Sequence, residues 1–181
     1  PELADFCGWG PDALDLAGAW HMNALKDTPG TDWFTPAFND STWLAVTAPG
    51  DDRNFALPKQ PAIYRRSFDL PADWVAKHPK TWIYLWDVNV AHTEQPETIY
   101  INGQKAGESP VQPPNIHWMT AEVTTFLQPG SNQVSLLLPD GYIGYRVYLS
   151  GTEPKQYPGL GAGLNQKWVD LVGWRQAVRV D

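Results

Sequence analysis

Aromatic rings and hydrogen-bonding groups stand together in several predicted loops, and this combination suits recognition of a polyhydroxylated ligand. A ring covers the apolar C–H face of a sugar, while amide, carboxylate and guanidinium groups fix the directions of its hydroxyls. Each residue alone is also typical of packing or of a surface ion pair, so the hypothesis rests on the whole set. The candidate ligand-binding residues are Asn115, His117, Trp118, Asp52, Arg53, Tyr142 and Trp33.

Loop carboxylates are the candidates for catalysis, because hydrolysis of a glycosidic bond needs two carboxylates across that bond. None of them has a recognisable catalytic context, and we interpret them as solvated charge. We therefore expect no catalytic residue in this chain. The carboxylates considered are Asp51, Asp52, Glu94, Glu97, Glu108 and Asp140.

Metal and cofactor sites have little support in the sequence. No two of the four histidines have the spacing of metal ligands. No loop is acidic enough to require calcium, so a structural calcium is not supported. We expect no metal and no cofactor.

The composition is that of a folded chain rich in turns. Of the 181 residues, 43% are hydrophobic, which excludes a disordered chain. The 17 Pro and 15 Gly suit an all-β fold. A net charge of -7 argues against nucleic acid as a partner, and no apolar run reaches transmembrane length. Cys7 is the single cysteine, so the sequence predicts no internal disulfide.

An Asn-Gly pair and a series of short apolar runs predict the elements that must position these residues. Asn102-Gly103 favours a tight hairpin turn. Residues 63–70 alternate between two faces, and residues 82–86 are apolar on both faces, as in a central strand. We predict an all-β fold, an antiparallel β-sandwich or jelly roll. The predicted strands are residues 15–22, 43–47, 63–70, 82–86, 99–101, 134–138 and 145–149.

The chain divides by composition into a lead-in (1–14), a sandwich domain (15–150) and an extension (151–181). The extension opens with a glycine-rich linker, and Asn165 is a candidate cap for a short helix that makes it partly helical. Two alternatives stay open for it. It is either the start of, or return to, a catalytic domain, or a terminal segment that packs on the sandwich. We interpret the chain as a segment of a longer protein.

Five motifs occur in the order found in one known family. They are Leu16-Ala17-Gly18-Ala19-Trp20, Asp40-Ser41-Thr42-Trp43, Tyr64-Arg65-Arg66-Ser67-Phe68-Asp69-Leu70-Pro71, Asn102-Gly103, and Leu127-Gln128-Pro129-Gly130-Ser131-Asn132-Gln133-Val134. Over residues 15 to 150 the chain resembles the sugar-binding, jelly-roll domain of family 2 glycoside hydrolases and related galactose-binding-like modules.

The resemblance implies a non-catalytic carbohydrate-binding or accessory module, since the family's catalytic carboxylates lie in a separate barrel domain. Its partner would be a glycan or the neighbouring catalytic domain of the same polypeptide, with no nucleic acid and no membrane. An extracellular or periplasmic location follows, as part of a larger enzyme. A structural spacer that docks a catalytic domain is the alternative, and a self-contained hydrolase ranks last.

Overall fold

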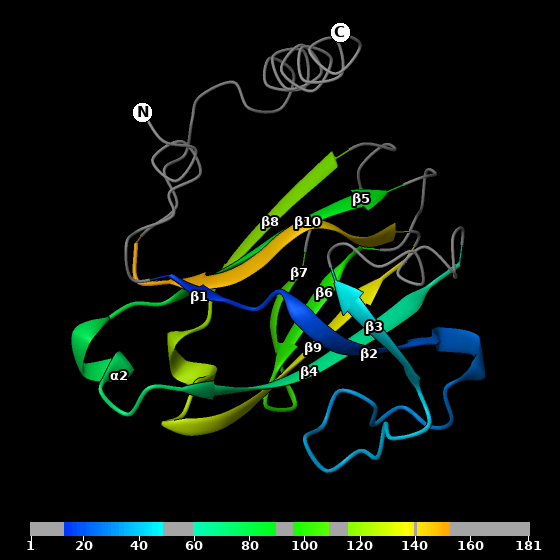
Figure 1. Cartoon of the computed structure of the whole chain (residues 1–181), viewed down its shortest axis with the longest axis horizontal. Coiled ribbons are helices and arrows are strands. Elements are labelled where there is room, and N and C mark those ends of the chain that lie inside the picture. The colour runs from blue at the N-terminus through cyan, green and yellow to red at the C-terminus, as the bar shows by residue number, and fades with distance from the viewer. Residues whose placement is uncertain (1–12, 49–59, 90–95, 109–115, 140, 153–181) are drawn as a thin grey trace, which may run out of the picture.

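A computed structural model describes residues 13–48, 60–89, 96–108, 116–139 and 141–152 of the chain (Figure 1). For residues 86–89, 116–118, 141–142 and 144–146 the description covers the backbone alone. Candidates Asn115, Asp52 and Arg53 therefore lie outside the described residues, as does the helix predicted from Asn165.

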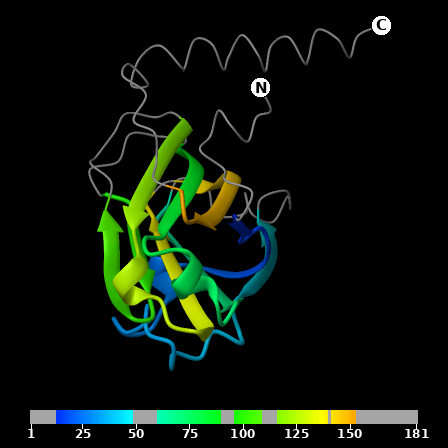
Figure 2. The same cartoon turned by 90° about the vertical axis from the view of Figure 1, so that its left-hand side faces the viewer.

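Two antiparallel sheets face each other and form a β-sandwich (Figure 2). The four-stranded sheet has the order β1 (Leu14–Asp15), β10 (Gly141–Ser150), β5 (Trp82–Asn89) and β8 (Ile116–Glu122). The six-stranded sheet has the order β3 (Leu44–Ala48), β2 (Gly18–Ala24), β4 (Ala62–Leu70), β9 (Gly130–Leu138), β6 (Thr98–Ile101) and β7 (Gln104–Glu108). The helical turns are η1 (Leu25–Asp27), α2 (Trp74–Lys77) and η3 (Thr124–Phe126).

The main core lies between the sheets and is filled by alternate residues of each strand. Tyr64 and Phe68 of β4 point into it, as the alternation of residues 63–70 predicts. Ile83 and Leu85 face it from β5, which lies between β10 and β8 and is the predicted central strand. The antiparallel sandwich predicted from the sequence is confirmed.

Two predictions of local structure were wrong. The run 15–22 is not one strand, because the chain leaves β1 at Asp15 and enters the other sheet at Gly18. Residues 116–118, predicted as part of a loop, begin strand β8. Polar residues interrupt the apolar pattern of that strand, and pairing with β5 sets its conformation.

Arg66 holds the crossover between the sheets. Its Nη1 donates to the carbonyls of Leu16 and Ala17 at 2.9 and 2.6 Å. Gly18 has φ +121°, and a Cβ there would lie 3.1 Å from the same Nη1. Glycine is therefore needed at this point for its backbone angle and for the close approach of the guanidinium.

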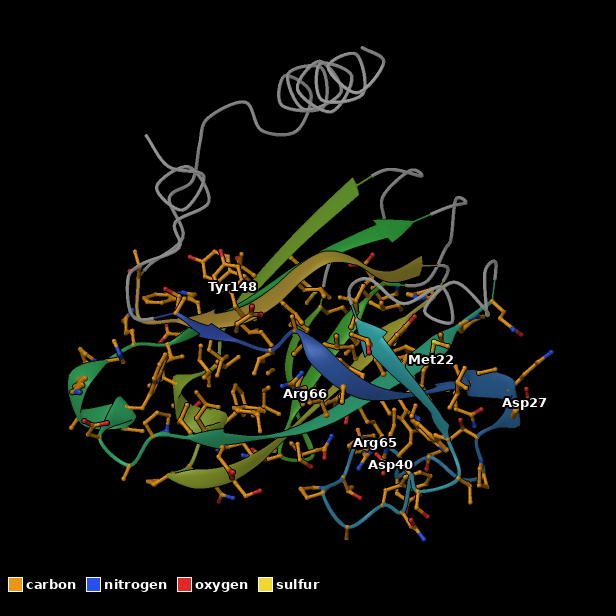
Figure 3. The ribbon with its side chains drawn as sticks, in the orientation of Figure 1. Met22, Asp27, Asp40, Arg65, Arg66 and Tyr148 are labelled. Atoms are coloured by element: carbon orange, nitrogen blue, oxygen red, sulfur yellow. The ribbon has the colours of Figure 1, made fainter. Side chains whose placement is uncertain are left out.

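Arg65 lies on the opposite side of β4 and is 2% exposed. It fastens the loop between η1 and β3 across the outer face of the six-stranded sheet (Figure 3). Its Nε donates to Asp40 Oδ2 at 2.8 Å. Its Nη atoms donate to loop carbonyls, those of Trp33, Thr35 and Phe38.

The contact between β7 and β8 closes one side of the sandwich. A Cβ on Gly107 of β7 would lie 2.6 Å from the Cβ of Ala121 and 3.1 Å from Met119 Cε. Real Cβ atoms do not approach so closely, so the lack of a side chain at Gly107 lets the two sheets meet here.

We expect Arg65→Met to lower the free energy of unfolding by about 3–5 kcal/mol, because it leaves a carboxylate and several covered carbonyls without their donor. Chemical denaturation measures this loss. Lys105→Met is the matched control, since Lys105 is an exposed cation of the same sheet. A loss no larger than that of the control would contradict the assigned role.

Gly107→Ala should lower the free energy of unfolding by about 1–3 kcal/mol through overpacking against β8. Ala121→Gly removes the atom that the new methyl meets, so the double variant should recover part of the loss. A double-mutant cycle measures this coupling. Purely additive losses would show that the two strands do not collide at this position.

Candidate functional site

The first candidate site is one end of the four-stranded sheet, where β5 ends between the beginnings of β8 and β10. Because β8 and β10 are antiparallel to β5, both begin where β5 ends. In the other sheet, β9 ends and β6 begins at this same end of the sandwich (right in Figure 1). The cross-strand pairs here are Val88 with Ile116 and Tyr142, Asp87 with His117, and Trp86 with Trp118 and Arg146.

Three sequence candidates come together at this end. His117 and Trp118 are the second and third residues of β8, and Tyr142 is the second residue of β10. The two strands flank β5, so all three residues lie within one three-strand segment of sheet. The sequence predicted a loop at His117 and Trp118. Their backbones instead belong to strand β8, which is paired with β5.

Trp33 does not join them. Its side chain is 6% exposed and lies on the outer face of the other, six-stranded sheet. It makes edge contacts with Phe34 at 5.5 Å and Tyr100 at 5.2 Å between ring centroids. The loop brings Trp33 onto the sheet because Arg65 binds its carbonyl. Its ring is therefore part of the packing and is not an exposed platform for a ligand.

Two of the carboxylates considered lie among the described residues. Glu108 is the last residue of β7 and not part of a loop, and it is exposed and paired with Lys105, as expected for solvated charge. The interpretation as solvated charge is wrong for Glu97, which is only 2% exposed and immediately precedes β6. It lies two residues before Ile99, which points into the core, and this alternation is the signal in the sequence that indicates burial. Asp51, Asp52, Glu94 and Asp140 lie outside the described residues.

Metal ligands do not gather in the described ranges, since no group of three His, Cys, Asp or Glu side chains is found there. Among the described residues, no helix has the length and apolarity needed to span a bilayer.

A second polar cluster lies at the surface, where Asp40 bridges two basic side chains. Its Oδ1 is 3.1 Å from His21 Nδ1, and its Oδ2 accepts from Arg65 Nε at 2.8 Å. His21 is paired in register with Arg65 on the neighbouring strand. Both carboxylate oxygens are thus used to hold the loop, and the cluster is a structural clamp, not an acid–base dyad.

The pKa of Asp40 lies below its ordinary value. Burial alone would raise this pKa, but the hydrogen bonds and positive charges of Arg65 and His21 outweigh it. The carboxylate is therefore favoured in its charged form in the folded protein.

Because the folded pKa of Asp40 is lowered, its contribution to stability is complete above the pKa of an unfolded aspartate. It is lost as pH falls through the lower folded pKa. We expect Asp40→Asn to cost stability near neutral pH and progressively less below about pH 4. Urea denaturation at several pH values measures this, with Asp32→Asn in the same loop as control. A loss independent of pH would contradict the charge-based clamp.

Comparisons with known proteins identify relatives in structure and none in sequence. No family model matches the chain, and no curated protein does. A β-glycosidase from Bacteroides vulgatus has a TM-score of 0.57 at 21% identity, over 77% of this chain and 20% of that one. A β-glucuronidase from glycoside hydrolase family 2 has a TM-score of 0.58 at 17% identity, over 76% of this chain and 17% of the other.

A β-glucuronidase from an uncultured Clostridium sp. has a TM-score of 0.56 at 15% identity, over 80% of this chain and 29% of the other. At such identities the likeness concerns the fold. In each case the chain spans less than a third of the length of the neighbour, so it has the fold of one part of these enzymes.

Proposed function

We propose that this chain is a non-catalytic carbohydrate-binding or accessory module of a glycoside hydrolase. The observation that carries the proposal is the strand register, which puts His117 and Trp118 of β8 at the same end of the four-stranded sheet as Tyr142 of β10, with β5 between the two strands. An aromatic ring next to hydrogen-bonding groups is the chemistry that a sugar requires.

The proposed site also includes residues of the segments that precede β8 and β4 in the chain. Asn115 directly precedes Ile116, and Asp52 and Arg53 lie between β3 and β4. Trp33 is left out because its ring is buried on the other sheet. The ligand would be a glycan, and the module would act outside the cytoplasm as part of a larger enzyme.

A structural spacer is the second candidate. Its support is the coverage, because the chain corresponds to 17–29% of the length of the enzymes quoted above. A module of this kind would present its loop end or an outer sheet face to a neighbouring catalytic domain of the same polypeptide. Binding measurements on single-residue variants separate this role from glycan binding.

Glycan binding should be weak, with a dissociation constant on the order of 0.01–1 mM, because solvated hydroxyls gain little on burial. Trp118→Ala should abolish it, since the stacking surface is lost. A glycan array followed by calorimetry provides the measurement, and a thermal melt of the variant verifies that it still folds.

Thr120→Ala is the matched control for this experiment, because Thr120 is an exposed residue of the same strand, two positions further along. It should bind as the wild type does. If no glycan binds, and Trp118→Ala instead weakens association with the neighbouring catalytic domain, the spacer is the correct function.

We also expect the chain to be catalytically silent towards aryl glycosides and polysaccharides. Of the carboxylates considered, Glu97 is buried and Glu108 is paired with Lys105, and neither has a catalytic context. Release of a chromogenic aglycone measures turnover. Turnover that disappears in Asp52→Asn or Glu108→Gln would identify a self-contained hydrolase.

A further inference from the structure

The turn between β6 and β7 contains the reactive dipeptide Asn102-Gly103, and the side-chain amide of Asn102 makes three hydrogen bonds. Asn102 has φ +50° and Gly103 has φ +83°, both in the left-handed region. The Asn102 side chain is partly buried and bridges the hairpin to two other segments, the end of η3 and the beginning of β9.

Three hydrogen bonds determine the orientation of this amide. Its Oδ1 accepts from the backbone N–H of Gln133 at 2.8 Å. Its Nδ2 donates to the carbonyl of Phe126 and to Asn132 Oδ1, both at 2.8 Å. Because one partner is a backbone donor and another a backbone carbonyl, the amide group cannot be reversed without losing these bonds.

Asn132 is held in the same way and is 3% exposed. Its Nδ2 donates to the carbonyls of Gln128 and Gly130 at 2.7 and 2.8 Å, and its Oδ1 also accepts from the N–H of Gln128 at 3.0 Å. These bonds fix the orientation of the Asn132 amide, so the atom that faces Asn102 is the oxygen Oδ1. This oxygen can only accept a hydrogen bond, and Asn102 must supply the donor.

Asn-Gly pairs undergo a known intramolecular reaction. The backbone nitrogen of the glycine attacks the side-chain carbonyl carbon of the asparagine, a C–N bond forms, and ammonia leaves. Water then opens the cyclic imide to aspartate or isoaspartate. Glycine favours the attack because it has no side chain to obstruct it.

We propose that Asn102 is a deamidation site that the folded hairpin keeps inactive, and that its conversion to an acid removes the side-chain bonds that hold the hairpin turn to the beginning of β9 and to η3. The reaction removes Nδ2 as ammonia and so breaks the two hydrogen bonds that Nδ2 donates, which is why the folded hairpin opposes it. After conversion, a carboxylate oxygen replaces Nδ2 and faces two acceptors, the Phe126 carbonyl and Asn132 Oδ1. Two acceptors without a proton between them repel each other, and each loses its donor.

The first test follows conversion of Asn102 in the full chain by mass spectrometry of its peptide, at mildly alkaline pH, folded and in urea. In urea the hydrogen bonds are absent, so we expect conversion more than about tenfold faster than in the folded chain. Equal rates in the two states would overturn the proposal. Asn132→Ala, which removes one acceptor, should accelerate conversion while the chain is still folded.

The second test measures the effect of the product directly. Asn102→Asp should lower the denaturation midpoint and increase hydrogen exchange in β6 and β7. Gln104→Glu adds the same charge at an exposed position of the same hairpin and is the matched control. An Asn102→Asp variant as stable as this control would show that the amide does not hold the hairpin, whatever its rate of conversion.

Discussion

The buried guanidinium of Arg65 is the interaction on which the outer half of the structure depends. A cation at 2% exposure persists only if its donors are satisfied, and most of the acceptors come from a loop some 25 to 32 positions earlier in the chain. Arg66 satisfies the carbonyls of the crossover on the other side of the same strand. Two adjacent arginines thus hold two irregular segments, because strand alternation points them in opposite directions.

The tryptophans whose side chains the structure describes serve packing. Every Trp whose side chain is described is buried, and these residues are Trp20, Trp33, Trp43, Trp74 and Trp82. They occupy the main core, the outer face under the first loop and the outer face of the four-stranded sheet. Tyr84 and Tyr148 stack on that last face at 4.7 Å.

The two ends of the sandwich are built differently, one by hydrogen bonds between side chains and the other by strand pairing. At one end the amides of Asn102 and Asn132 join the β6–β7 hairpin to β9. Asn132 Oδ1 accepts from Asn102 Nδ2 and from the N–H of Gln128. At the other end, β8 and β10 begin on either side of β5 and bring His117, Trp118 and Tyr142 together. The hairpin end is thus closed by hydrogen bonds between side chains, whereas the opposite end gathers the ends of β5, β8 and β10 through strand pairing.

The sequence by itself determined the sandwich, because strand alternation, the Asn-Gly turn and the spacing of Pro and Gly are local properties. That His117, Trp118 and Tyr142 belong to one ligand site stays a prediction. The tertiary structure decided that Trp33 packs on the opposite sheet, that residues 116–118 pair with β5, and that Glu97 is buried. These outcomes depend on which distant segment covers or pairs with each residue, and periodicity along the chain carries little information about that partner.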